Sequence, residues 1–135
     1  GVLSPRLFER YVIAPTRTIV DAIRARHPGV PVIGFPRLAG VQVGAYAAAT
    51  GVNAVALDTG TALELALPLV PPGVATQGNL DPLALVVGGD ALTREVAAVL
   101  GAVHGRPHIF NLGHGIVPQT PPEHVAQLLA QVRAA

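Results

Sequence analysis

Four short apolar runs alternate with helical patterns along this chain, and this alternation constrains the fold more than any other feature. The runs cover residues 30–35, 53–57, 74–77 and 108–112, the third being the weakest. Continuous apolar runs are typical of strands buried on both faces, and their alternation with amphipathic helices predicts parallel βαβ units. Because crossovers between parallel strands are right-handed, two α/β arrangements remain, a doubly wound sheet or a (β/α) barrel.

The strand ends favour the barrel. Polar residues follow each run, at 35–37, 58–59, 77–79 and 111–114, and a barrel builds its site from the carboxyl ends of its strands. Neither a Gly-x-Gly-x-x-Gly loop nor a Walker-type Gly-Lys-Ser/Thr is present, which weakens the nucleotide-binding alternative. A full barrel needs about 250 residues. We therefore expect residues 1–135 to form a single segment with four units, about half of a (β/α)8 barrel of the TIM type.

Capping residues and prolines between the runs predict where helices start. Ser4, Asp81 and Thr120 each precede a proline and are expected as N-caps. Pro15 falls inside the first helical pattern, where its missing N–H should interrupt or kink the helix. The expected helices cover the N-terminal residues up to His27, then 41–50, 61–67, 90–103 and 121–133.

Composition excludes several classes of function. The formal net charge is +1, and the nine basic residues, all arginine, form no stripe, so a nucleic-acid partner is not expected. No apolar run approaches the roughly 18 residues of a membrane span. The absence of cysteine excludes disulfides and thiolate metal sites and fits a reducing compartment.

His114 is the main candidate for substrate binding. It stands between Gly113 and Gly115 directly after the fourth run, where glycines allow a ligand to approach the backbone closely. A histidine there can bind a carboxylate. The competing interpretation is a structural histidine that fixes the turn over residues 111–118.

Other polar residues at the strand ends have weaker cases. Arg37 could pair with a carboxylate or remain solvated in its loop. Asp58 could face the mouth of the barrel, but capping of the next helix is the preferred interpretation. Amide side chains suit loop support rather than direct contact. No pair of histidines has ligand spacing near a carboxylate, so no metal site is expected. The supporting residues are Gln77, Asn79, Asp58 and Asn111.

Three motifs in order resemble the C-terminal half of the uroporphyrinogen decarboxylase family. They are QGNLDP at 77–82, NLGHG at 111–115 and PEHV at 122–125, and the similarity runs from about Ser4 to the end. The resemblance implies a (β/α)8 barrel to which this chain contributes strands five to eight. It also implies a lyase without a cofactor that converts four acetate side chains of uroporphyrinogen to methyl groups, giving coproporphyrinogen in haem biosynthesis.

The resemblance also limits what this segment can carry. Members are usually cytoplasmic homodimers, and the aspartate, arginines and tyrosine of their site belong to the N-terminal half. No catalytic residue is therefore assigned here, and only the substrate-contacting histidine carries over, onto His114. The family commonly has tryptophan after the aspartate that ends its sixth strand, whereas Thr59 follows Asp58 here. This departure makes the shape of the pocket harder to predict.

Two other functions stay open at this point. A corrinoid-linked methyltransferase of the same barrel superfamily would hold zinc with cysteine and histidine, and the absence of cysteine argues against it. A half-barrel serving as a binding or assembly module is the other. Because a half-barrel exposes strand edges and an apolar flank, we expect the isolated chain to be inactive and either dimeric or prone to aggregation.

Overall fold

The computed structural model describes residues 3–135 and places four strands in one parallel sheet. The strands pair in the order in which they occur in the chain, with no reversal. A doubly wound sheet changes direction at a switch point, whereas consecutive strands of a barrel lie side by side. The structure thus confirms four consecutive parallel β/α units. The strands are β1 (Ile33–Gly34), β2 (Ala54–Ala56), β3 (Ala75–Leu80) and β4 (His108–Leu112).

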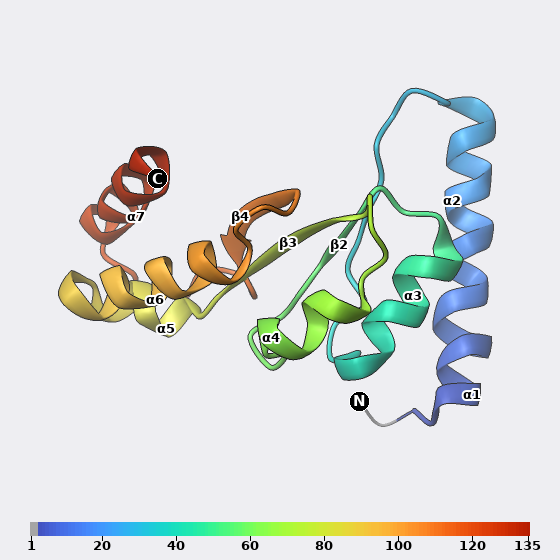
Figure 1. Ribbon diagram of the computed structural model, residues 1–135, viewed down its shortest axis with the longest axis horizontal. Coiled ribbons are helices and arrows are strands. Elements are labelled where there is room, and N and C mark those ends of the chain that lie inside the picture. Colours follow the sequence, from blue (N-terminus) through green and yellow to red (C-terminus); the bar gives the residue numbers. More distant parts are fainter. Residues whose placement is uncertain (1–2) are drawn as a thin grey trace.

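Helices connect successive strands and form the outside of the molecule (Figure 1). Within residues 3–135, none combines the length and apolar character needed to cross a bilayer. Two of the elements are short 3-10 turns and one is a π-helical turn. The elements are α1 (Pro5–Phe8), η1 (Glu9–Ile13), α2 (Ala14–Arg26), η2 (Gly40–Gln42), α3 (Val43–Thr50), α4 (Leu63–Ala66), η3 (Leu67–Leu69), α5 (Pro82–Val87), α6 (Gly89–Ala102) and α7 (Pro122–Ala134).

The first helix shows how the chain accommodates Pro15. The π-helical turn η1 ends two residues before this proline, and α2 continues directly from it. Widening the turn absorbs the missing backbone N–H without ending the helix. Ser4 and Asp81 cap α1 and α5 as predicted, since their side chains accept from the backbone of Leu7 and Leu83.

The predicted cap of the last helix is wrong by one residue. Pro121 occupies the N-cap position of α7, and no side chain caps this end. The hydroxyl of Thr120 is instead buried with no partner among residues 3–135.

The core consists of two apolar clusters on the helical side of the sheet. The larger one packs the N-terminal helices and α3 against β2, with Ile13 and Val55 almost fully buried. The smaller one joins the end of β3 to the last three helices around Leu80 and Leu92. Phe110 of β4 packs against both clusters, so the fourth strand couples the two halves of the core.

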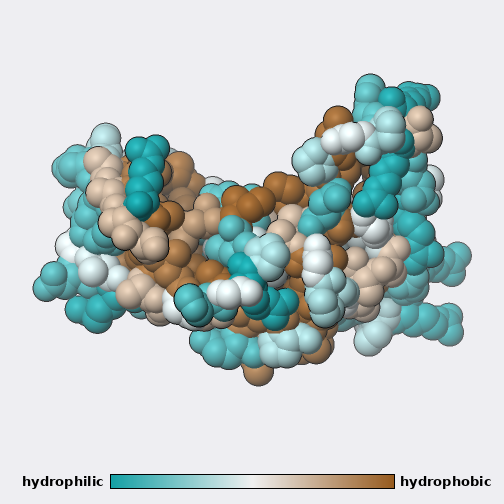
Figure 2. Space-filling model, turned by 45° about the horizontal axis from the view of Figure 1, so that its top comes forward, coloured by the Kyte–Doolittle hydropathy of each residue, from teal (hydrophilic) through white to brown (hydrophobic). Residues whose placement is uncertain are grey.

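The other side of the sheet is open, which corrects two predictions. The run 30–35 is not a strand buried on both faces: only Ile33 and Gly34 pair, and Ile33 and Phe35 are 46% and 48% exposed. The fourth strand is not buried either, because it lies at the sheet edge and Ile109 is 42% exposed. Figure 2 shows the resulting hollow, with apolar surface on its floor. An exposed apolar inner face is what a half-barrel leaves uncovered.

The third strand is longer than predicted. It continues through Gly78 to Leu80 and makes the most extensive pairing in the sheet, with β4. Residues 78–80, which the sequence places in a loop, are therefore strand. Gly78 packs so closely on the residue that follows β2 that a Cβ there would lie 2.5 Å from the Leu57 carbonyl oxygen. The glycine that suggests a turn serves instead to let two strands approach.

Candidate functional site

A hollow of about 490 Å³ opens at the carboxyl ends of the strands. Parallel strands deliver these ends to one edge of the sheet, and the pairing of Asn79 with Asn111 brings β3 and β4 level there. Of the described residues that line the hollow, His114 alone has a titratable side chain. Its other lining side chains are apolar or amide. The lining side chains include those of Ile33, Phe35, Gln77, Asn111, Leu112, His114 and Ile116.

His114 is half-buried in the loop that follows β4. Its ring nitrogen Nδ1 lies 2.8 Å from the hydroxyl oxygen of Thr59, in the loop after β2. No other side chain or backbone atom among residues 3–135 hydrogen-bonds to the ring. The second nitrogen, Nε2, is therefore the one available to a ligand in the hollow.

The loop that carries His114 is held close to β2. The backbone N–H of Gly113 donates to the Leu80 carbonyl at 2.8 Å, which ties the end of β4 to β3. A Cβ at position 113 would lie 2.5 Å from the Thr59 backbone nitrogen. Only glycine fits this approach, whereas a Cβ added at Gly115 would meet no atom of the described residues within 4 Å. The two glycines flanking the histidine thus have different roles.

Asp58 organises the backbone behind this contact. The residue is 2% exposed, and its carboxylate accepts from the backbone N–H of Leu38 at 2.6 Å and of Gly60 at 2.9 Å. The hydroxyl of Thr61 donates to it as well, at 3.3 Å. The helix-capping interpretation is wrong, because Ala62 is the N-cap of α4. Asp58 instead joins the loops after β1 and β2, and it does not face the hollow.

The amide side chains divide between support and exposure to the hollow. The Asn79 side chain donates to the carbonyls of Asp58 and Thr61, at 3.2 and 2.7 Å, and so steadies the loop after β2. Gln77 and Asn111 line the hollow, and the Asn111 amide oxygen accepts from the next backbone N–H. Of the four predicted supporting residues, Asp58 and Asn79 hold the loops, and Gln77 and Asn111 lie at the surface where a ligand would sit.

The structure does not bring Arg37 into this group. Its side chain is exposed, it is absent from the lining of the hollow, and no ion pair or hydrogen bond holds it among residues 3–135. The neighbouring Leu38 has a positive φ of 59° and gives its N–H to Asp58. This turn directs the chain toward α3.

His108 occupies the opposite end of β4 and has a different environment. Its Nδ1 lies 2.9 Å from the Thr76 hydroxyl, and its Nε2 donates to the Gly78 carbonyl at 2.8 Å. Burial lowers the pKa of this imidazole, and the Gly78 hydrogen bond opposes the shift only in part. Both nitrogens are satisfied by β3, so His108 has no free atom for a ligand.

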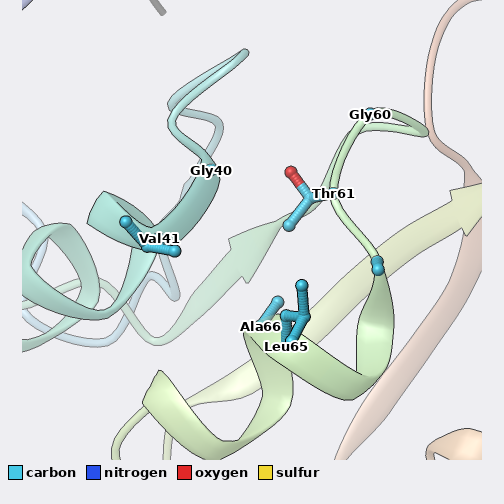
Figure 3. Close-up of a pocket in the computed structure, with 7 residues that line it drawn as sticks. Gly40, Val41, Gly60, Thr61, Leu65 and Ala66 are labelled. Atoms are coloured by element: carbon cyan, nitrogen blue, oxygen red, sulfur yellow. The ribbon is translucent and has the colours of Figure 1, made fainter.

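A second, smaller hollow of about 90 Å³ lies between the segments that follow β1 and β2. Figure 3 shows Val41, Thr61, Leu65 and Ala66 around it. The hydroxyl of Thr61 bonds to Asp58, and no lining residue carries a titratable side chain. This hollow offers no chemistry to a substrate. Over residues 3–135, no three histidine or carboxylate side chains cluster as metal ligands would.

Thr59 is the residue whose role the sequence did not reveal. In the sequence, Thr59 is notable only because it departs from the family pattern. A threonine after a strand has no characteristic function. Its partner lies 55 positions away in the chain, so the contact depends on how closely two loops approach. The glycine at 113 is the one local signal of that approach.

Comparisons with known proteins cover the whole chain. The family model described as "Uroporphyrinogen decarboxylase (URO-D)" matches residues 1–135. Curated relatives named uroporphyrinogen decarboxylase include those of Gluconacetobacter diazotrophicus and Granulibacter bethesdensis, 59% and 61% identical over 133 residues. That of Rhizorhabdus wittichii is 59% identical over 133 residues. Each alignment covers 98% of this chain but only 38% or 39% of the relative.

Proposed function

The chain belongs to the uroporphyrinogen decarboxylase family, and from this premise we propose that the complete protein carrying it is a carboxy-lyase acting on uroporphyrinogen. It converts the four acetate side chains to methyl groups, which yields coproporphyrinogen for porphyrin and haem biosynthesis. The family fold is a (β/α)8 barrel, of which the four parallel units described here are a part. The chain spans about 38% of the length of its curated relatives, so the activity is that of the whole barrel.

In this reaction the substrate's own pyrrole ring accepts the electron pair released by decarboxylation. Protonation of the pyrrole α-carbon next to the carbon that bears the acetate creates a cationic ring, whose positive charge is shared by the acetate-bearing carbon. The C–C bond to the carboxylate then breaks, its electron pair enters the ring, and CO₂ leaves. A proton delivered to the exocyclic methylene carbon gives the methyl group, and loss of the proton first added to the ring restores the neutral pyrrole. Because the ring accepts the electrons, the protein needs no cofactor and supplies donors for carboxylates, charge stabilisation and proton transfer.

His114 supplies one of these donors. We assign Nε2–H of this ring to a carboxylate of the substrate, because the ring lines the hollow and Nδ1 already has its partner in Thr59. This free nitrogen, on the one titratable side chain that lines the hollow among residues 3–135, is the observation that carries the proposal. The amides of Gln77 and Asn111 add neutral donors on the same surface. Arg37 is left out of the binding group because it does not reach this surface.

The remaining properties follow the family. We propose a cytoplasmic homodimer that binds uroporphyrinogen and takes neither nucleic acid nor membrane as a partner. The open apolar face, with Ile33, Phe35 and Ile109 exposed, must be covered by further strands before a substrate site is complete. The isolated chain is therefore expected to lack activity and to dimerise or aggregate. Measurable decarboxylation by the purified 135-residue chain would show this view of the half-barrel to be wrong.

The assay that tests the function uses the complete protein. Incubation with uroporphyrinogen should release CO₂ and give products that have lost one to four carboxyl groups, resolved by chromatography. Absence of any decarboxylated product from a folded protein would reject the proposal. The names of the curated relatives do not favour the corrinoid-linked methyltransferase. Metal analysis of the same preparation provides an independent check, since that enzyme would retain zinc.

A further inference from the structure

Two segments far apart in the chain meet at one hydrogen bond beside the hollow. Thr59 follows β2 and His114 follows β4, and the Thr59 hydroxyl oxygen lies 2.8 Å from Nδ1 of the imidazole. The distance is that of a well-formed hydrogen bond. The bond fixes one edge of the ring, while the ring itself lines the hollow.

Both partners of this bond are held independently of it. On the Thr59 side, the buried Asp58 carboxylate and the Asn79 amide fix the backbone after β2. On the His114 side, the Gly113 N–H bonds to the Leu80 carbonyl, and the missing Cβ at 113 allows the loop to lie against Thr59. Such pre-organised contacts orient a side chain without a further entropic cost at the moment of binding.

The chemistry of the hydroxyl suits a ring that must donate at Nε2. A substrate carboxylate only accepts hydrogen bonds, so Nε2 must carry a proton to bind it. In a neutral imidazole, Nδ1 is then bare and accepts from the Thr59 hydroxyl. In an imidazolium, Nδ1–H donates to the same oxygen. The hydroxyl thus holds Nδ1 in either protonation state and fixes the orientation of the ring, which leaves Nε2 facing the hollow.

We propose that Thr59 is a positioning residue for substrate binding, which holds His114 through Nδ1 so that Nε2–H points to a substrate carboxylate in the hollow. This role rests on the proposed function, because it names the substrate of that site. Thr59 itself is absent from the lining of the hollow, so it acts through the histidine.

Kinetics of the complete enzyme test the proposal with two matched variants. Thr59→Val keeps the shape but removes the hydroxyl, and we expect about a fivefold rise in KM for uroporphyrinogen, the worth of one hydrogen bond of about 1 kcal/mol. Thr59→Ser keeps the hydroxyl and should stay within about twofold of the parent enzyme. Failure of serine to restore KM would overturn the positioning role.

A double-mutant cycle separates positioning from a merely structural contribution. In a His114→Ala background, Thr59→Val should change KM by less than about twofold, since the ring it positions is gone. An unchanged fivefold effect in that background would contradict the proposal. The ¹⁵N signals of His114 in selectively labelled, substrate-free enzyme should shift in Thr59→Val but not in Thr59→Ser.

The two proposals fail in different ways. A folded parent enzyme with no decarboxylation would reject the proposed function and the substrate named here. An active enzyme whose KM and ¹⁵N signals do not respond to Thr59→Val would reject the positioning role alone.

Discussion

The two ends of β4 each hold a histidine, and their surroundings differ in one decisive respect. Both ring nitrogens of His108, at the amino end, form hydrogen bonds to β3, with the Thr76 hydroxyl and the Gly78 carbonyl. His114, beyond the carboxyl end, gives one nitrogen to Thr59 and keeps the other for the hollow. The same side chain is thus structural at one end of a strand and available to a ligand at the other.

This difference follows from the geometry of parallel β/α units. At the amino ends of the strands, the register aligns Thr76 with His108, so the side chains of neighbouring strands satisfy each other. At the carboxyl ends, the chain leaves the sheet in loops that must be tied by extra contacts, such as those of Asp58 and Asn79. Barrel folds place stability at the first edge and function at the second.

The largest effect is expected from a substitution that creates a steric clash between two loops. Gly113→Ala puts a Cβ 2.5 Å from the Thr59 backbone nitrogen, so the loop must shift. A displacement of about 1 Å at a binding group can cost about 10²-fold in rate. We expect a loss of this order in kcat/KM of the complete enzyme. Gly115→Ala, which meets no atom within 4 Å, is the matched control, and equal losses in both variants would contradict the role of the close approach.

Removal of the ligand-facing imidazole ranks next. His114→Ala should lower kcat/KM by about an order of magnitude or more, consistent with loss of one charge-assisted hydrogen bond. Chemical denaturation should show little change in the free energy of unfolding, since the half-buried ring has a single hydrogen-bond partner among residues 3–135. Unchanged kinetics would remove His114 from the site.

The histidine at the other end of the strand should show the reverse pattern. His108→Ala removes hydrogen bonds to Thr76 and Gly78 and an edge contact with Phe110. We expect a loss of about 1–2 kcal/mol in the free energy of unfolding, with kcat and KM of the folded enzyme unchanged. A selective loss of activity without destabilisation would reverse the assignment of the two histidines.

The smallest effect is a pH dependence of stability. Burial lowers the pKa of His108 below its usual 6.5 in the folded state, so the unfolded chain binds this proton more tightly. The associated stability is present above about pH 6.5 and falls as the pH drops below it. The decrease in Tm between pH 7.5 and 5.5 should be smaller in His108→Gln, which cannot titrate. An identical decrease would show that other groups control the acid sensitivity.

Much of the fold could be predicted because β-branched runs and prolines are local signals. Asp81 before Pro82 gave the start of α5, and the apolar run at 108–112 gave β4. The predictions that were wrong concern residues whose environment depends on segments distant in the sequence. The apolar run predicts that Ile33 and Phe35 are buried. They are exposed because only one face of the sheet is covered within this segment.

The site was predictable in its position but not in its contacts. The glycines beside His114 placed it in a loop at a strand end, and the structure finds it there on the hollow. The function of Asp58 could not be read from the sequence, because its partners include the Leu38 backbone, 20 positions away. The same is true of Thr59, whose contact with His114 depends on the packing of two loops.

A structure of the complete protein with coproporphyrinogen, the product proposed above, bound to it tests the central claim most directly. The quantity to measure is the distance from Nε2 of His114 to the nearest carboxylate oxygen of the bound tetrapyrrole. A separation of about 2.7–2.9 Å, the range of charge-assisted hydrogen bonds, is the predicted result. A bound product whose carboxylates all lie beyond hydrogen-bond reach of that nitrogen would contradict the account.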